Sequence, residues 1–529
     1  MTVQQVLIDG QWTTSSGTST FQAVNPRTRE PLPGKYPVSP WAEVVRAIEA
    51  ASRAAAIVRD WSGDRFAAFL DRFADRIDAR AAELVEIANL ETALPVQPRL
   101  KDAELPRTTN QLRQAATAAR DGSWTIPTID TAPNIRSMLR SIGPVVVFGP
   151  NNFPFAFNSI AGGDFAAAVA SGNPVIAKGH SSHPGTTRLL AEEAQLAATE
   201  TGLPAGFVQL IYRTNHDDGK RLVSHPAIGA SGYTGSRSAG SQLKEAADRV
   251  GKPIYLELSS INPIFILPGA IRERCAALAE QFAASCLMGV GQFCTNPGLI
   301  VVQSGPESED WIQQVANRFQ AAPIGTLLGP SVQSHLEAGL RTLTAHGATV
   351  VTGGSSGGGA GYCCQNTLLR VTGTQFVVAP AALQTEAFGN AALVVVVESD
   401  AEFAAVAQAL EGNLTGCLYT ANDGSDDALY DQIAPIVRQK VGRLLNDKMP
   451  TGVAVVPAMN HGGPFPATGH PGFTAVGIPA SLRRFAMLQC YDGVRPHRLP
   501  PLLADKSPHE ALWRLIDSKW RQGDVPTAK

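Results

Sequence analysis

The sequence has little cysteine, no long apolar run and no excess of one charge. Its 529 residues include 7 cysteines, an odd number, which indicates free thiols in a reducing compartment rather than a disulfide framework. No apolar run reaches the ~18 residues that a membrane helix needs, and the first residues lack the pattern of a secretory signal. The 44 basic and 46 acidic residues give no reason to expect nucleic acid as a partner. We therefore expect a cytoplasmic protein without a membrane segment.

The sequence is instead rich in short apolar runs that alternate with helical stretches. Hydrophobic residues make up 44% and charged residues 17%, which is typical of a globular chain, and the length suggests two to four domains. Helical spacing dominates residues 39 to about 94, and another helix is expected around residues 110–119. From residue 143 to 257, apolar runs and helices alternate, which predicts an α/β fold with a parallel sheet covered on both faces. Such sheets bind ligands at the carboxyl ends of their strands.

A second alternating block extends to about residue 450 and predicts another α/β unit. Within it, the glycine-rich residues 353–361 lack the Lys-Ser/Thr pair that ends a phosphate-binding loop, so we expect a hairpin-type connection there. The C-terminal part is rich in proline and arginine, and one amphipathic helix is predicted near residues 510–520.

Several polar residues stand where chemistry is possible, and each also has an ordinary structural interpretation. Cys294, in GQFCTNPG, lies between a helix and a strand and suits a nucleophilic thiol, although a lone cysteine is more often buried core. Glu257 ends an apolar strand and suits a general base or a salt bridge. Asn152, in GPNNFP, suits an oxyanion donor or a turn.

Three other segments suit a nucleotide. Lys178 ends a strand and either reaches a nucleotide hydroxyl or is a solvated charge. The segment GYTGSRSAG ends a strand and starts a helix, where free N–H groups suit a pyrophosphate, although the dinucleotide fingerprint of three spaced glycines is absent. His180 and His183 have no cysteine or acidic cluster beside them, so we expect no metal site.

The order of these motifs is more specific than any one of them. PNNF, VIAKGH, TGS, LELSSINP, QFCTNPG and EAFG occur in the order and at the intervals of the aldehyde dehydrogenase superfamily, which the chain resembles over nearly its whole length. The resemblance implies a Rossmann-like cofactor-binding domain in residues 1–121 and 142–257 and an α/β catalytic domain in residues 258–455. It further implies bridging and oligomerisation segments in residues 122–141 and 456–529, in a homodimer or homotetramer.

The resemblance also implies a role for each matching residue. Cys294 is the expected nucleophile, Glu257 the general base and Asn152 the oxyanion donor. Further matching positions are expected to bind the ribose, pyrophosphate and nicotinamide of the cofactor: Lys178, Gly235, Ser236, Glu386 and Phe388.

Departures from the usual pattern point to one branch of the superfamily. Asn151 replaces the usual Trp before the oxyanion donor, SSINP replaces GGKNP, and GNAAL follows EAF where Gly-Pro-Val is usual. With KGHSSHPGTT and the long C-terminal tail, these features resemble the α-ketoglutaric semialdehyde (2,5-dioxopentanoate) dehydrogenases and an NADP-dependent bacterial fatty aldehyde dehydrogenase. We expect oxidation of 2,5-dioxopentanoate to 2-oxoglutarate, with a fatty or other aliphatic aldehyde as the alternative.

The cofactor is expected to be NADP in preference to NAD. NAD-specific relatives carry Glu three residues beyond the strand-end lysine, where this chain has Ser181, which does not repel a 2′-phosphate. Arg213, just past the next strand, is placed to pair with that phosphate.

Two other functions remain open on the sequence alone. A cysteine hydrolase needs a fixed Cys–His pair, for which His461 in NHGG is the candidate. A catalytically silent nucleotide-binding protein is disfavoured because Cys294, Glu257 and Asn152 are all present.

Overall fold

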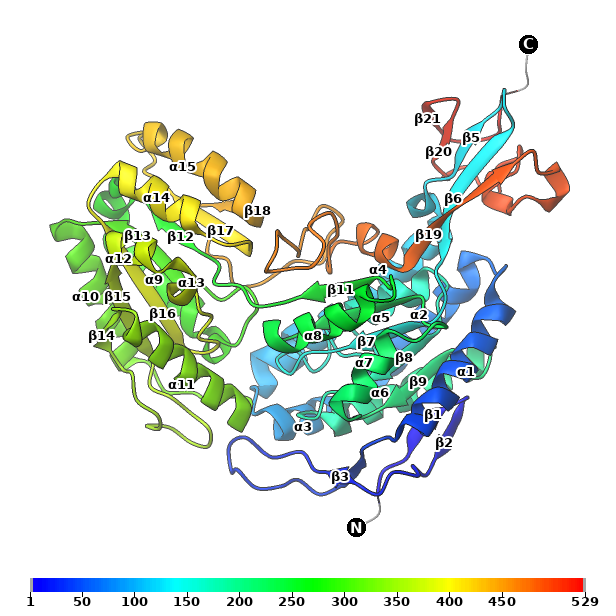
Figure 1. The fold of residues 1–529 in the computed structure, drawn as a ribbon, viewed down its shortest axis with the longest axis horizontal. Helices are drawn as coiled ribbons and strands as arrows, with labels where there is room; N and C mark the ends of the chain where they lie inside the picture. The colour runs from blue at the N-terminus through cyan, green and yellow to red at the C-terminus, as the bar shows by residue number, and fades with distance from the viewer. Residues whose placement is uncertain (1–2, 527–529) are drawn as a thin grey trace.

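The computed structural model describes residues 3–526, which form two large lobes and a smaller arm. Each lobe is built on its own seven-stranded sheet, and the arm on a five-stranded sheet (Figure 1). After the second lobe, the chain runs back as an irregular segment between the lobes before it enters the arm (Figure 1). None of the helices in the described range is both long and apolar enough to cross a membrane.

The first lobe contains the parallel sheet that the sequence predicts. Its strand order is β11-β10-β7-β8-β9-β1-β2, and the first five of these strands are parallel. Their residues are almost all buried because the sheet is covered by helices, which confirms the α/β class. The strands are β1 (Val6–Ile8), β2 (Gln11–Thr13), β7 (Val145–Phe148), β8 (Val175–Lys178), β9 (Val208–Ile211), β10 (Ala230–Thr234) and β11 (Ile254–Glu257).

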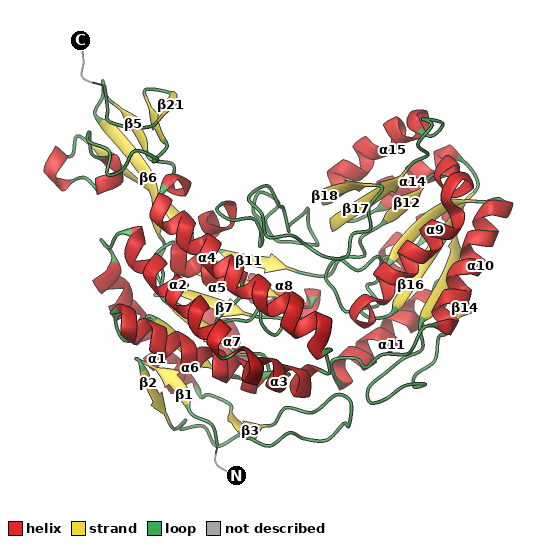
Figure 2. Ribbon diagram, turned by 180° about the vertical axis from the view of Figure 1, so that it is seen from behind, coloured by secondary structure: helices red, strands yellow, loops and turns green. Residues whose placement is uncertain are grey.

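The helices of the first lobe pack around this sheet and on one another (Figure 2). They are α1 (Trp41–Val58), α2 (Gly63–Ala79), α3 (Ala81–Thr92), α4 (Leu105–Asp121), α5 (Gly163–Ala170), α6 (Pro184–Thr201), α7 (His216–Val223) and α8 (Arg237–Asp248). An irregular helix, η1 (Val96–Glu104), leads into α4, and β3 (Thr20–Phe21) pairs with β4 (Tyr36–Pro37).

The second lobe repeats the α/β architecture. Its sheet has the order β14-β15-β16-β13-β12-β17-β18, and only β14 is antiparallel to its neighbour. The strands are β12 (Ile264–Ile266), β13 (Leu299–Gln303), β14 (Thr349–Thr352), β15 (Thr367–Thr372), β16 (Ala391–Val397), β17 (Asn413–Tyr419) and β18 (Val441–Asn446). The helices are α9 (Pro268–Leu287), α10 (Pro306–Ala321), α11 (Pro330–Ala345), α12 (Gly373–Val378), α13 (Pro380–Leu383), α14 (Asp400–Ala409) and α15 (Asp427–Lys440). Residues 353–361 connect the antiparallel strands β14 and β15, as the sequence predicts.

The arm corrects one prediction from the sequence. Its sheet has the order β19-β6-β5-β20-β21, with β5 (Thr128–Asp130), β6 (Ile135–Ser141), β19 (Ala486–Asp492), β20 (Arg514–Ile516) and β21 (Lys519–Arg521). The helix predicted near residues 510–520 is therefore wrong, because β20 and β21 form a hairpin there. Asp517 and Ser518 both adopt positive φ, 45° and 63°, the turn conformation that two-residue hairpins favour. The buried Arg514 donates to the Ala504 carbonyl, a tertiary contact that helical spacing does not reveal.

Candidate active site

Cys294 lies in a tight turn that the local sequence explains. α9 and the short helix η3 (Met288–Gly291) end in front of it, and β13 begins after it. Gly289 and Gly291 have φ of 56° and 67°, and a Cβ at Gly291 would lie 2.0 Å from the Gly389 carbonyl oxygen. Only glycine fits there, so this turn presents the Cys294 side chain half-buried at the junction of the lobes.

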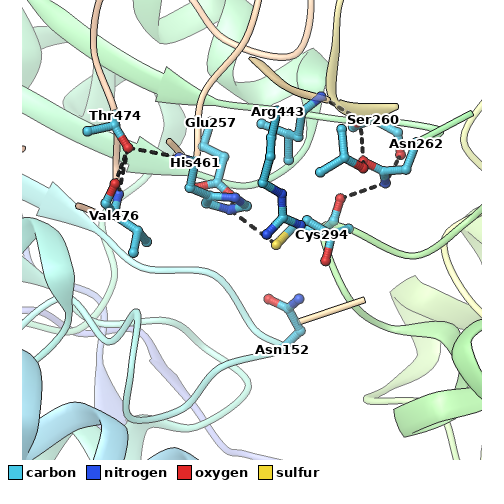
Figure 3. A network of polar contacts seen from close by, with 12 residues as sticks. Asn152, Glu257, Ser260, Asn262, Cys294, Arg443, His461, Thr474 and Val476 are labelled. Atoms are coloured by element: carbon cyan, nitrogen blue, oxygen red, sulfur yellow. Dashed lines mark hydrogen bonds and ion pairs between the residues drawn. The ribbon is translucent and has the colours of Figure 1, made fainter. Parts of the chain in front are cut away.

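His461 joins Cys294 to Glu257. Its Nε2 atom lies 3.3 Å from the Cys294 Sγ atom and 2.7 Å from the Glu257 Oε1 atom (Figure 3). Both His461 and Glu257 are buried, and Glu257 Oε2 has no hydrogen-bond partner within the described structure. Since the same nitrogen faces both groups, the arrangement differs from a triad in which the two ring nitrogens have separate partners. The three ligand-type atoms lie within 4.8 Å of one another, a spacing at which they could also hold a metal ion.

The charge of His461 is set by this cluster. Burial lowers the pKa of His461, but the negative charges of Glu257 and Cys294 and their hydrogen bonds outweigh burial and raise the pKa to about 10. The imidazolium form is therefore favoured at neutral pH, between a carboxylate and a thiol.

Replacing His461 with glutamine is expected to remove a pH-dependent part of the stability. Folding raises the pKa of His461 from 6.5 to about 10. The stabilisation that comes from protonated His461 is therefore fully present below pH 6.5 and is lost as the pH rises towards 10. The Tm advantage of the wild type over His461→Gln should therefore shrink between pH 6.5 and 10 in calorimetry. The exposed His335 provides the control variant, His335→Gln. A Tm difference for His461→Gln that stays constant over this range would contradict the raised pKa.

A segment distant in sequence brings His461 to the site. Thr468 forms a bridge with Glu257, the Leu258 N–H donates to the Ala467 carbonyl at 2.8 Å, and the His461 N–H donates to Thr474 at 2.8 Å. The segment expected to bridge subunits, 456–529, thus also contributes a site residue. The sequence signal was the NHGG histidine, which suggested only a hydrolase.

Asn152 approaches the same thiol from the loop after β7 (Figure 3). Its buried side-chain amide donates to the Gln292 carbonyl at 3.0 Å, and the Asn152 carbonyl accepts from Arg99 at 3.0 Å. These contacts fix the amide and leave its second N–H available. Within residues 3–526, the Cys294 N–H has no hydrogen-bond acceptor, so it is a second free donor next to the thiol.

Asn262 holds the cysteine loop, and the sequence did not single it out. Its side-chain amide donates to the carbonyls of Cys294 and Asn296, both at 2.9 Å. It has a φ of 47°, so it occupies a left-handed position that asparagine tolerates better than most residues. The only sequence signal was its place in the SSINP segment, between Ile261 and Pro263.

The predicted cofactor residues lie in two groups. The first group follows the carboxyl edge of the parallel sheet: Lys178, Ser181, Arg213, Gly235 and Ser236. Ser236 caps α8 by accepting from the Ala239 N–H, and Lys178 pairs in register with Ile211, two residues before Arg213. Burial, with the charge of Arg213, lowers the pKa of Lys178 to about 8.

The second group lies in the other lobe, next to the cysteine turn. Glu386 and Phe388 line a pocket together with Phe293, the residue before Cys294; its empty space is about 440 Å³, including the part open to solvent. Burial raises the pKa of Glu386 to about 7, although the neighbouring Ser259 and Ser260 donate to its carboxylate and oppose this rise. Glu386 and Phe388 thus lie beside the cysteine turn, whereas the first group follows the sheet edge of the other lobe.

Comparison with known proteins identifies the family. Residues 12–449 match the model of the Aldehyde dehydrogenase family. The chain belongs to the aldehyde dehydrogenase family. It is 39% identical to alpha-ketoglutaric semialdehyde dehydrogenase 2 of Azospirillum brasilense, over 97% of this chain and 98% of that one. It is 33% identical to alpha-ketoglutaric semialdehyde dehydrogenase of Acinetobacter baylyi, over 95% and 96% of the two chains.

Solved structures show the same fold. The betaine aldehyde dehydrogenase of Staphylococcus aureus in complex with NAD+ superimposes with a TM-score of 0.79 at 20% identity, covering 92% of this chain and 94% of that one. The predicted aldehyde dehydrogenase fold is thus confirmed, and the protein is an oxidoreductase that acts on the aldehyde group.

Proposed function

We propose that the protein oxidises an aldehyde to a carboxylic acid with NAD(P) through a covalent intermediate on Cys294. The observation that carries this proposal is the Cys294 thiol, half-buried, 3.3 Å from His461 Nε2 and facing the fixed amide of Asn152. Acyl chemistry needs a nucleophile, a neighbouring acid–base group and an oxyanion donor, and Cys294, His461 with Glu257, and Asn152 match these roles.

The first half of the reaction uses Cys294 and Asn152. The imidazolium of His461 stabilises the negative thiolate, which attacks the aldehyde carbon. The Asn152 amide and the Cys294 N–H then stabilise the oxyanion, and loss of one such donor typically costs ~100–1000-fold in rate. Loss of a hydride from the former aldehyde carbon, to the nicotinamide cofactor, would then leave a thioester on Cys294.

The residues at the sheet edge fit a nicotinamide cofactor. The capped start of α8 offers free N–H groups, and Lys178 is a half-buried cation with no ion-pair partner in the described range. When bound, NAD(P) supplies the acceptor for the hydride. Glu386 would bind a ribose hydroxyl, and Phe388 would contact the nicotinamide; both line the pocket that also includes Phe293.

The second half of the reaction uses Glu257 and His461. The Glu257 carboxylate takes a proton from water, and the resulting hydroxide attacks the thioester to release the acid. His461 holds the Glu257 carboxylate at 2.7 Å and remains available to protonate the departing thiolate. The Cys–His pair that a cysteine hydrolase requires is present, and it favours ester hydrolysis as a second activity, because hydrolysis of a thioester is this same half-reaction.

We further propose NADP as the preferred cofactor. Lys178 and Arg213 follow adjacent strands, and neither forms an ion pair with a carboxylate within residues 3–526. Ser181 adds no negative charge. Two neighbouring cations without an acidic partner suit a 2′-phosphate.

Arg213→Ser is expected to lower kcat/KM for NADP by ~10–100-fold and to leave NAD almost unchanged, because a charge-assisted hydrogen bond is lost. Steady-state kinetics with both cofactors measure this effect. Arg249→Ser, at a 73% exposed arginine, is the control. A wild type that strongly prefers NAD would contradict the assignment of Ser181 and Arg213.

For the substrate we propose 2,5-dioxopentanoate. The names of the two curated relatives support this substrate, and so does the positive charge around the thiol, where Arg107, Arg443 and His461 gather. A channel for a fatty aldehyde needs apolar walls instead.

An aldehyde panel tests the substrate. With NADP, kcat/KM for 2,5-dioxopentanoate should exceed that for a medium-chain aldehyde by at least ~100-fold, because buried cations are left unpaired by an apolar chain. Succinic semialdehyde keeps the carboxylate on a shorter chain, and glutaraldehyde keeps the five carbons without a charge. The two compounds therefore separate the effect of charge from that of length. A medium-chain aldehyde that is the best substrate would contradict the proposal and support the fatty aldehyde alternative.

We also propose a cytoplasmic homodimer or homotetramer that assembles through the arm. Large apolar side chains are exposed on β19 and the C-terminal hairpin, with exposed fractions of 67% for Leu488, 54% for Trp520 and 45% for Met487. Apolar side chains gathered on a projecting sheet favour its burial against another subunit.

A further inference from the structure

Arg107 is a cation without a partner. It lies in the first turn of α4, and its Nε and Nη2 atoms are buried with no hydrogen bond within the part of the chain that the structure describes. The side chain as a whole keeps some access to solvent. Since a buried guanidinium is unfavourable when unpaired, this position favours an anion that arrives from outside the protein.

The acidic groups near Arg107 contact other residues. The Glu104 Oε1 atom accepts from the N–H groups of Phe155 and Ala156, at 2.9 and 3.0 Å, and the Oε2 atom accepts from Arg99. The Glu257 Oε1 atom faces His461, and its Oε2 atom forms no hydrogen bond with Arg107 in the described structure. The protein thus surrounds Arg107 with carboxylates that are held by other donors.

Aromatic rings place Arg107 close to the reacting thiol. Its guanidinium carbon lies 5.7 Å from the ring centre of Phe153 and 5.2 Å from that of Phe157. The Phe157 ring centre is in turn 6.0 Å from that of His461. Burial lowers the pKa of Arg107, and the charge of Cys294 is the largest influence that opposes this effect.

Arg443 also lies beside Cys294 in Figure 3, but both terminal nitrogen atoms of its guanidinium are engaged. It donates to the carbonyls of Pro450 at 2.9 Å and Gly452 at 3.3 Å, so it fixes the loop after β18. Arg107 is therefore the better placed of the two to receive a ligand.

We propose that Arg107 binds the carboxylate of the substrate and selects aldehydes that carry an anionic group at the far end of a short chain. The proposal rests on the proposed oxidation at Cys294. In 2,5-dioxopentanoate, four carbon–carbon bonds of about 1.5 Å each separate the aldehyde carbon from the carboxylate carbon, so the two ends reach across one aromatic ring. The fork of the guanidinium matches a carboxylate, and Phe153 and Phe157 exclude water from the pair.

Kinetics of Arg107→Met with charged and uncharged aldehydes test this role. We expect KM for 2,5-dioxopentanoate and succinic semialdehyde to rise by ~10–100-fold, while kcat/KM for uncharged pentanal changes by less than ~3-fold. Arg107→Lys keeps the charge but loses the fork, so KM should be intermediate, and this variant also serves if Arg107→Met does not fold. Arg113→Met on the same helix is the matched control, since Arg113 is 41% exposed and pairs with Asp75 and Asp78.

The outcomes separate this proposal from the one on which it rests. If Arg107→Met loses as much kcat/KM on pentanal as on the anionic aldehydes, Arg107 has a structural role. If its KM values are unchanged, Arg107 does not bind the substrate. Either result overturns the proposal. In both cases wild-type oxidation of aldehydes through Cys294 would stand. A wild type that reduces neither NADP nor NAD with any aldehyde would instead overturn the proposed function itself.

Discussion

Aldehyde oxidation is expected to fall by at least ~10⁴-fold when Cys294 is replaced with alanine, because the covalent path then has no nucleophile. The Asn152 amide and the bound cofactor remain, but neither forms the adduct from which hydride departs. The rate of NAD(P)H formation, followed by its absorbance at neutral pH, measures the loss of activity. Cofactor binding to Cys294→Ala should persist, since the sheet edge is untouched.

Cys490→Ala is the matched control for this prediction. Cys490 is an exposed free cysteine on β19 in the arm, away from the lobe junction. Its replacement should leave kcat/KM unchanged and show that thiol removal as such has no effect. Turnover retained by Cys294→Ala would mean that oxidation proceeds without a thioester, and the proposed mechanism would fail.

The sequence predicted the parts of the protein whose signal is local. Apolar runs of four or five residues between helices marked the strands β7 to β11, because strands buried on both faces read as continuous apolar segments. Cys294 alone was ambiguous. Its position in an ordered series of motifs led to the aldehyde dehydrogenase family, which the comparisons confirm.

Contacts between distant segments could not be predicted in the same way. His461 is 167 residues from Cys294 and 204 residues from Glu257, and nothing in NHGG indicates that the chain returns between the lobes. Arg107 follows a proline at the start of a helix, and its sequence surroundings resemble an exposed helix face. Its burial depends on Phe153 and Phe157, which belong to a different loop. The misassigned C-terminal helix has the same cause, because tertiary contacts of Arg514 override the helical spacing.

Replacing Glu257 with glutamine is expected to stop turnover after the first oxidation. Glutamine keeps the size of the side chain but cannot take a proton from water, so the thioester on Cys294 persists. We expect a burst of NAD(P)H close to one equivalent per active site, followed by a steady state slowed by ~10²–10⁴-fold. Stopped-flow absorbance measures the burst, and intact-protein mass spectrometry detects the acyl group on Cys294. Glu280→Gln, at a 70% exposed glutamate, is the control and should turn over normally.

The burst also separates the two partners of His461. If Glu257 serves only as the base for water, the burst keeps its rate and only the later phase slows. If Glu257 mainly maintains the charge of His461, its loss also destabilises the thiolate, because the charge of Glu257 is the largest single influence that raises the pKa of His461. The burst would then slow in Glu257→Gln and in His461→Gln to a similar extent. A burst that disappears while Cys294 stays unacylated would therefore assign Glu257 to the first half of the reaction and contradict its role as the hydrolytic base.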